Sequence, residues 1–242
     1  MNVSVVIPAH NESLILGETV SNLRNILVQN FEEYEIVLVE NGSKDDTKNI
    51  CESLAKADSR VTTLSLPVGD YGLALRHGIA ASAYDKIIVF DADLYSGDFV
   101  KDALRILALE QDTAVIVASK RNKESVDTRS GYRKLGTLTL STIMRVVFGL
   151  KVSDTHGMKF VDRSLLREEL AHTYETGSLY DTALILRAER NGKKVKEVAC
   201  TIKEMRPPRT KYAYRALQTI YLLGKLRIRL LAESRQPLTP AS

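Results

Sequence analysis

Residues 86–95, KIIVFDADLY, decide the fold. The segment from Ile87 to Phe90 is apolar on both faces of an extended chain, which is typical of a strand buried inside a parallel sheet. It ends in two carboxylates, Asp91 and Asp93, one residue apart. Because residues i and i+2 of an extended chain point to the same side, we expect both carboxylates to hold one hard divalent cation, Mg²⁺ or Mn²⁺.

Similar apolar, β-branched runs surround this segment. They are VSVVIP (3–8), YEIVLVE (34–40), VTTLSL (61–66) and TAVIVAS (113–119), with helix-length segments near 13–28, 44–57, 71–84 and 98–110 between the strands. Strands that alternate with helices predict an α/β, Rossmann-like fold, with a mainly parallel sheet and helices on both faces. We expect Ser43 to begin the second helix as part of a capping box that extends to Asp46.

The pattern changes after residue 119. A polar stretch at 120–134 predicts a mobile loop, and 135–150 predicts a helix. A further strand and helices follow, then an edge strand within 193–205. We expect one domain at 1–211, an amphipathic helix at 212–234 and a flexible tail at 235–242.

The composition excludes several classes of protein. The chain has 242 residues, of which 44% are hydrophobic, and a net charge of +4, so it is long enough for a full core and lacks the basic balance of a general nucleic-acid binder. Cys51 and Cys200 show no metal-binding spacing, which indicates reduced thiols. The first residues contain no export signal, and no apolar stretch reaches the length of a membrane span. We therefore expect a cytoplasmic protein.

The segment 212–234 predicts a helix with one apolar face. Leu217, Ile220, Tyr221, Gly224, Ile228 and Leu231 share that face, Leu223, Leu226 and Leu230 widen it, and Arg215, Lys225 and Arg229 form a basic stripe. This pattern fits a helix lying in a membrane interface, and it fits equally a helix packed on its own domain or on a partner subunit.

Polar residues follow the predicted strands, where ligands bind in open parallel sheets. Glu40 and Asn41 suit contacts to a nucleobase and a ribose hydroxyl, and Gly69, Gly72 and Gly78 allow close approach of the backbone. Together with Asp91 and Asp93, these positions indicate a site for a nucleoside diphosphate and its cation.

The segments VVIPAHNE, EIVLVENGSKDDT, GLALRHGIAAS and IIVFDADL, in this order, resemble family 2 glycosyltransferases of the GT-A fold. The likeness covers residues 2–212 and is strongest to polyprenyl-phosphate and dolichyl-phosphate mannosyl- and glucosyltransferases. It implies an inverting, metal-dependent enzyme that moves a hexose from GDP-mannose or UDP-glucose to a polyprenyl phosphate.

The resemblance also implies roles for individual residues. The donor would be bound by Pro8, Ala9, Glu12, Glu40, Asn41, Gly69, Ala92 and Lys120, and the acceptor phosphate by Arg121, Arg133, Arg206, Arg209 and Lys211, with Arg129 and Thr210 nearby. The chain departs from the family at Tyr95, where mannosyl relatives often have Gln, at Lys120, where Arg is usual, and at Ala183, where Glu is usual. Glu40 and Asn41 replace two Asp.

The acceptor decides whether a base is needed. A lipid phosphate is largely ionised at neutral pH and needs no strong base. A soluble or glycan hydroxyl would need one, and Asp181, which matches an acidic position of the family, is the first candidate, ahead of His10 and His156.

The predicted partners are a nucleotide sugar, a polyprenyl-phosphate lipid, the cytoplasmic face of a membrane and a membrane-anchoring subunit. An inactive nucleotide-binding module is the competing interpretation from another class, because of Tyr95, Lys120 and Ala183. A nucleotidyltransferase fits less well, because PAHNESLIL is not the Gly- and Lys/Arg-rich loop that grips a triphosphate.

Overall fold

The computed structural model describes residues 1–119, 126–127, 142–202, 222–230 and 232. Contacts between residues divide the chain into two units, Met1–Lys203 and Glu204–Ser242. Each unit is described by itself, and the predicted boundary at residues 211 and 212 lies outside the described ranges.

The first unit is built on a seven-stranded sheet with the order β3-β2-β1-β4-β7-β5-β8. Its strands are β1 (Val3–Ala9), β2 (Tyr34–Asn41), β3 (Val61–Leu66), β4 (Lys86–Val89), β5 (Thr113–Ser119), β7 (Lys159–Asp162) and β8 (Lys194–Ala199). All neighbours run parallel except β7, which is antiparallel to both β4 and β5. The mainly parallel sheet and the edge position of β8 confirm the predicted fold class.

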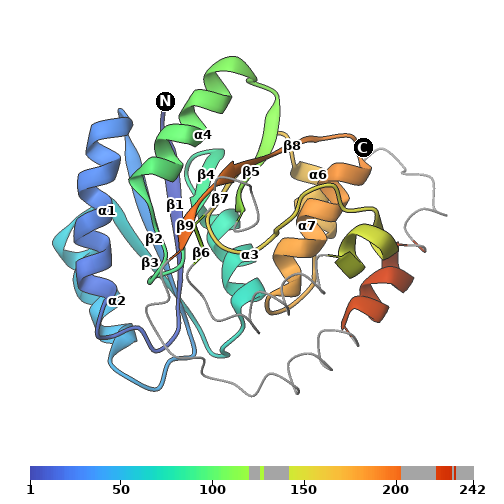
Figure 1. The fold of residues 1–242 in the computed structure, drawn as a ribbon. Helices are drawn as coiled ribbons and strands as arrows, with labels where there is room; N and C mark the ends of the chain where they lie inside the picture. The colour runs from blue at the N-terminus through green and yellow to red at the C-terminus, as the bar shows by residue number, and fades with distance from the viewer. Residues whose placement is uncertain (120–125, 128–141, 203–221, 231, 233–242) are drawn as a thin grey trace, which may run out of the picture. The chain divides into compact units, whose positions relative to one another are not determined.

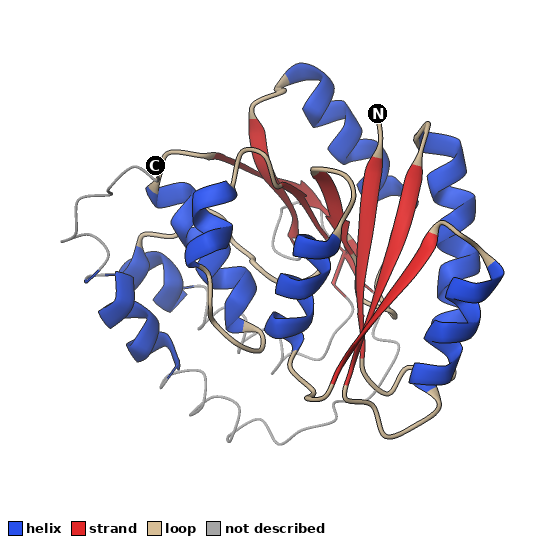
Figure 2. Ribbon diagram, turned by 180° about the vertical axis from the view of Figure 1, so that it is seen from behind, coloured by secondary structure: helices blue, strands red, loops and turns tan. Residues whose placement is uncertain are grey.

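Helices cover both faces of this sheet (Figures 1 and 2). They are α1 (Leu16–Asn30), α2 (Thr47–Ala57), α3 (Tyr71–Ala81), α4 (Gly97–Leu109), α6 (Arg167–His172) and α7 (Leu179–Arg190). Side chains from α1, α2 and α4 belong to one core cluster with alternate strand residues. On the other face, Gly78 of α3 lies so close to the sheet that a Cβ there would come within 2.4 Å of Val6 Cγ1.

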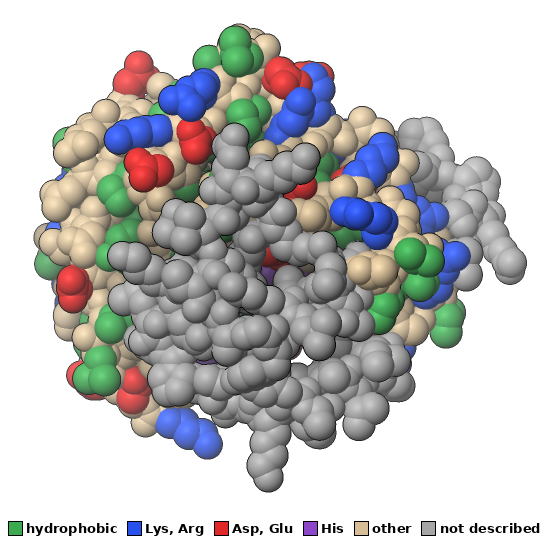
Figure 3. Space-filling view, in the orientation of Figure 1, with side chains coloured by type: hydrophobic (Ala, Val, Ile, Leu, Met, Phe, Trp, Pro, Cys, Tyr) green, Lys and Arg blue, Asp and Glu red, His purple; other side chains and the backbone are tan. Residues whose placement is uncertain are grey.

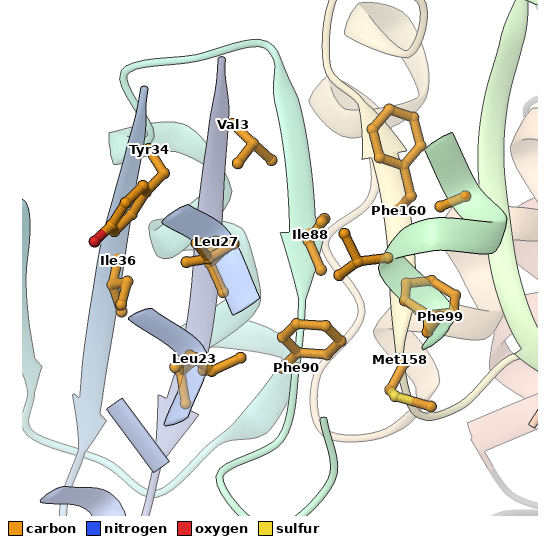
Figure 4. Close-up of a cluster of buried hydrophobic side chains, with 14 of the residues drawn as sticks. Val3, Leu23, Leu27, Tyr34, Ile36, Ile88, Phe90, Phe99, Met158 and Phe160 are labelled. Atoms are coloured by element: carbon orange, nitrogen blue, oxygen red, sulfur yellow. The ribbon is translucent and has the colours of Figure 1, made fainter. Parts of the chain in front are cut away.

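The main core is apolar and lies between α1, α4 and the sheet. Figure 4 shows Leu23 and Leu27 of α1 over Val3 and Ile36 of the strands. Phe90 meets Phe99 of α4 edge to face, with 6.0 Å between ring centroids. Burial of these side chains contributes about 1.5–3 kcal/mol each to folding.

The predicted capping box at Ser43 is wrong. Helix α2 begins at Thr47, and its N-cap, Asp46, makes no side-chain capping bond. The Ser43 hydroxyl instead accepts a hydrogen bond from the Asn11 backbone N–H at 3.0 Å, in the loop after β1. The Ser43 hydroxyl, which the local pattern assigned to the helix N-terminus, therefore binds a residue that is distant in the sequence.

The stretch predicted as a loop at 120–134 contains a short strand, β6 (Val126–Asp127). It pairs in parallel with β9 (Thr201–Ile202) in a separate two-stranded sheet. Residues 142–148 are helical, as predicted for the second half of 135–150.

The second unit contains a described helical segment at 222–230. Leu223, Leu226 and Leu230 are buried there, whereas Ile228, which was predicted to lie on the apolar face, is 69% exposed. Across the described residues, no helix is both long and apolar enough to cross a bilayer.

Charged side chains of both signs are interspersed on the surface above α4 (Figure 3). Lys101 lies 3.9 Å from Asp98, and Arg105 lies 3.0 Å from Asp102, each one helical turn away. This mixture agrees with the mild net charge of the sequence.

Candidate active site

A cavity of about 370 Å³ lies where β1, β2, β3 and β4 reach their carboxyl ends. Its lining is Pro8, His10, Glu12, Asn41, Gly69, Tyr71, Asp91, Ala92 and Asp93. Four loops that are far apart in sequence therefore meet at one edge of the sheet, as expected for ligand sites in open α/β sheets. Of the residues predicted to bind the donor, Pro8, Glu12, Asn41, Gly69 and Ala92 line this cavity.

Asp91 and Asp93 both line the cavity, but the reason given for their pairing was wrong. Strand β4 ends at Val89, and the Leu94 N–H donates to the Asp91 carbonyl at 3.0 Å, which closes a tight turn. Both residues therefore border the cavity from a turn and not from an extended strand. Asp91 is partly buried and Asp93 is exposed.

The donor set fits a cation that is shared with a ligand. Among the described residues, no group of three or more His, Cys, Asp or Glu side chains is arranged to hold a metal ion. Two carboxylates at an open cavity match the way proteins hold Mg²⁺, with one or two carboxylates and the phosphates of the substrate completing its shell. Asp91 and Asp93 would hold such an ion.

Tyr71 is a site residue that the sequence did not reveal. It is the first residue of α3, directly after Asp70, whose carboxylate caps the helix by accepting from the Leu73 N–H at 2.8 Å. Burial raises the pKa of Asp91, whereas the positive charge of Lys159 and a hydrogen bond from the Tyr71 hydroxyl lower it. Tyr71 therefore helps to keep Asp91 charged.

Asp181 lies behind the cavity and does not line it. Its Oδ2 accepts from Lys159 Nζ at 2.8 Å, and both side chains are only 1% exposed. The negative charge of Asp181 raises the pKa of Asp91, so the two carboxylates are close enough to interact. The buried ion pair and the cavity thus share one electrostatic environment.

His10 and His156, the other candidate bases, use both ring nitrogens in the structure. His10 Nδ1 donates to the Asn41 carbonyl at 2.8 Å, so His10 Nε2 accepts from Asn11 at 2.9 Å. His156 Nε2 donates to the Ser178 carbonyl at 3.0 Å, and its Nδ1 accepts from the adjacent Thr155 hydroxyl at 3.1 Å. These bonds give both imidazoles a structural role.

The loops that form the cavity wall are bonded to one another. The Glu12 N–H donates to the Thr47 hydroxyl at 2.8 Å, and the Lys44 N–H donates to Asn11 Oδ1 at 2.8 Å. Gly69 fits against His10 so closely that a Cβ would come within 2.9 Å of the ring. Hydrogen bonds and close packing thus connect the loops after β1, β2 and β3 on this side of the cavity.

Asp70 joins this wall to the entry of α7. Besides capping α3, its Oδ1 accepts from the Gly177 N–H at 2.9 Å. Next to it, a Cβ on Gly72 would lie 2.8 Å from Tyr180 Cβ. This close approach of α3 and α7 sets the positions of Tyr71 and Asp181.

The remaining predicted residues lie elsewhere. Ala9 is fully buried in β1, and the Glu40 carboxylate is used internally, accepting from the Ser43 N–H at 2.6 Å and the Ser65 hydroxyl at 2.7 Å. The Tyr95 hydroxyl accepts from Asn22 of α1 at 2.9 Å. Lys120, Arg121, Arg129, Arg133, Arg206, Arg209, Thr210 and Lys211 lie outside the described residues.

The sequence of residues 4–170 matches the model of a known family, described as glycosyl transferase family 2. This chain belongs to glycosyl transferase family 2. The match spans β1 to the first part of α6, so it includes every residue that lines the cavity.

Several relatives in the family carry lipid-phosphate names. The chain is 25% identical over 207 residues to a dolichyl-phosphate beta-glucosyltransferase of Trichomonas vaginalis, covering 81% of this chain and 64% of that protein. It is 27% identical over 154 residues to an undecaprenyl-phosphate 4-deoxy-4-formamido-L-arabinose transferase of Pseudomonas fluorescens, covering 63% and 44%. The chain thus spans less than two thirds of the length of these relatives.

Solved structures share the fold at low sequence identity. Mannosyl-3-phosphoglycerate synthase from Rubrobacter xylanophilus superposes with a TM-score of 0.73 at 16% identity, covering 100% of this chain and 78% of that one. Glucosyl-3-phosphoglycerate synthase from Mycobacterium tuberculosis, solved with Mn²⁺, UDP and phosphoglyceric acid, gives 0.69 at 19%, covering 93% and 78%. The predicted GT-A fold is therefore confirmed.

Proposed function

We propose that this chain catalyses the inverting transfer of a hexose from a nucleotide sugar, GDP-mannose or UDP-glucose, to a polyprenyl phosphate. The family, the cavity at the carboxyl edge of the sheet and the two carboxylates in it support glycosyl transfer from a nucleotide donor. The names of the Trichomonas and Pseudomonas relatives support a lipid-phosphate acceptor.

The observation that favours a phosphate acceptor is the burial of Asp181 and its ion pair with Lys159. A hydroxyl acceptor needs a base that can reach it. Asp181 is 1% exposed and ion-paired with Lys159, and both nitrogens of His10 and of His156 are engaged. A phosphate acceptor is already ionised and can attack without such a base.

The residues that line the cavity would have two roles, contact with the nucleotide and binding of the cation. Pro8, Glu12, Asn41 and Gly69 would border the nucleotide, and Asp91 and Asp93 would hold Mg²⁺ or Mn²⁺ on the donor diphosphate. When bound, the cation stabilises negative charge on the departing diphosphate. The acceptor phosphate attacks the anomeric carbon from the face opposite that diphosphate, which inverts the configuration.

The basic residues of the sequence complete this proposal. Lys120, Arg121, Arg133, Arg206, Arg209 and Lys211 would grip donor and acceptor phosphates, with Arg suited to paired hydrogen bonds. The segment 212–234 would lie on the cytoplasmic face of a membrane, alone or beside an anchoring subunit.

The second candidate keeps the donor and replaces the lipid by a soluble acceptor. The Mycobacterium structures with bound phosphoglyceric acid favour it. Removing residues 213–242 distinguishes the two, because an enzyme of lipid surfaces should lose binding to vesicles, whereas a soluble enzyme should change only in stability.

The test is release of nucleoside diphosphate from GDP-mannose, UDP-glucose and UDP-N-acetylglucosamine with Mg²⁺ or Mn²⁺, with and without polyprenyl phosphate in detergent. We expect release that needs one donor, the cation and the lipid together. Asp91→Asn should abolish it, and Asp98→Asn, an exposed Asp on α4, is the matched control that should not. Release that ignores the lipid but responds to a soluble hydroxyl favours the second candidate, and no release with any donor favours an inactive module.

A further inference from the structure

Lys159 is the one described lysine that is almost completely buried, at 1% exposure. Its ammonium donates to Asp181 Oδ2 and to the Gly157 carbonyl, both at 2.8 Å. Buried ion pairs seldom stabilise a fold more than apolar side chains of the same size would. The fold alone therefore gives little reason for a charged pair at this position.

Its place in the sheet points to the cavity. Lys159 begins β7 and pairs with Val89, the last residue of β4. Residues directly opposite each other in an antiparallel pair lie on the same face, and so does a residue two positions further along a strand. The Lys159 ammonium thus lies at the end of β4 from which Asp91 follows, and its charge acts on Asp91.

Lys159 and Asp181 carry opposite charges, and both charges act on Asp91. Asp93, Asp181 and Lys159 are among the described charged side chains that act on Asp91. Lys159 cancels the charge of its partner Asp181, so this ion pair adds no net charge beside Asp91 and Asp93.

We propose that Lys159 is a positioning residue for the cation, whose fixed charge cancels that of Asp181 so that Asp181 adds no attraction for the bound ion to that of Asp91 and Asp93. This inference rests on the proposed function, because it assumes that Asp91 and Asp93 bind the cation. Without Lys159, a third carboxylate would attract the ion, which would then leave slowly with the nucleoside diphosphate. Lys159 therefore sets an affinity that allows turnover, in which product release often limits the rate.

The test measures Mn²⁺ affinity in the full chain, from the electron paramagnetic resonance signal of the free ion, with and without GDP and UDP. Lys159→Met should bind Mn²⁺ about tenfold more tightly, and Asp181→Asn about tenfold more weakly, as Coulomb interactions at short range and intermediate dielectric predict. The double variant Lys159→Met with Asp181→Asn should return to about the wild-type affinity.

Lys86→Met is the matched control. Lys86 also forms an ion pair with a buried Asp, Asp162, on the same two strands, but at their opposite end. Lys86→Met should leave the Mn²⁺ affinity unchanged. If Lys159→Met does not fold, the comparison of Asp181→Asn with the double variant isolates the same charge, and the double variant should bind more tightly by about tenfold.

A purely structural ion pair predicts a different pattern, in which both single variants weaken Mn²⁺ binding or leave it unchanged. That pattern, with wild-type binding that still depends on Asp91, overturns the role of Lys159 and leaves the proposed function standing. Wild-type binding no tighter than that of Asp91→Asn in every condition contradicts the metal site of the proposed function, and the inference fails with it.

Discussion

The contact between α3 and α7 predicts that one Gly→Ala substitution will destabilise the protein where the same change elsewhere stabilises it. Gly72 and Gly17 are each the second residue of a helix, α3 and α1 respectively. Alanine in place of a helical glycine normally adds about 0.5–1 kcal/mol of stability. At Gly17 no atom lies within 4 Å of the new Cβ, so Gly17→Ala should show this gain.

At Gly72 the new Cβ would meet Tyr180 Cβ at 2.8 Å, the Gly177 carbonyl at 2.9 Å and the Glu175 carbonyl at 3.0 Å. The two carbonyl oxygens belong to the backbone and Tyr180 Cβ is fixed by it, so none of them can rotate away. Helix α3 must therefore separate from α7 and from the segment before it. Overpacking of this kind costs about 1–3 kcal/mol. Because both variants share the helix-propensity term, their difference in free energy of unfolding should equal the overpacking cost, about 1–3 kcal/mol.

Urea unfolding followed by circular dichroism measures this difference, provided that the dependence on urea is the same for both variants. In thermal unfolding it corresponds to about 2–4 °C per kcal/mol for a domain of this size. Equal stabilities of Gly72→Ala and Gly17→Ala would refute the tight packing of α3 on α7. Weaker Mn²⁺ binding by Gly72→Ala is also expected, since Tyr71 would move away from Asp91.

Three further predictions follow from burial. Arg187→Met should lower the free energy of unfolding by about 3–5 kcal/mol, because it breaks a buried, bidentate ion pair with Glu175. Arg105→Ala, on the exposed face of α4, should change it by less than about 1 kcal/mol. Similar losses for the two variants in urea unfolding would contradict this prediction. Burial raises the pKa of Asp91, so the metal-free folded protein holds a proton that the unfolded chain releases, and its stability should fall as the pH rises from the ordinary Asp range through that raised pKa. Asp91→Asn should remove this part of the pH dependence, measured as the urea midpoint in the presence of a chelator, and parallel curves would count against it. Burial also raises the pKa of Cys51 to about 11, so its thiol should react with a disulfide reagent at about pH 8 only after unfolding.

The sequence predicted those features that depend on local pattern. Apolar runs identified the parallel strands, and the residues after them identified Asn41, Gly69, Asp91 and Asp93 of the cavity lining. The resemblance to family 2 glycosyltransferases added Pro8, Glu12 and Ala92. The pairing of Asp91 and Asp93 was expected for the wrong reason, because a turn that closes at Leu94 is not visible in the spacing of two carboxylates.

Features that depend on contacts between distant segments could not be predicted from the sequence. Ser43 looked like a helix cap because its partner, the Asn11 N–H, lies in another loop. The burial of Lys159 has no local signal in the sequence, because it follows from the position of β7 between β4 and β5. Tyr71 had a weak signal, since the preceding Asp70 is a typical N-cap that would place it at the start of a helix facing the strand ends.

The antiparallel strand β7 has a consequence for how the protein is made. In the described sheet β4 and β5 each pair with β7 and not with one another. The centre of the sheet therefore cannot form until residues 159–162 have been synthesised. Lys159 is synthesised 40 residues after Ser119, the end of β5, which corresponds to about 2–8 seconds of translation. During that interval two apolar strands have open edges, and unpaired edges of this kind promote aggregation. A nascent chain of this protein is therefore expected to need a chaperone most between the emergence of β5 from the ribosome and that of β7.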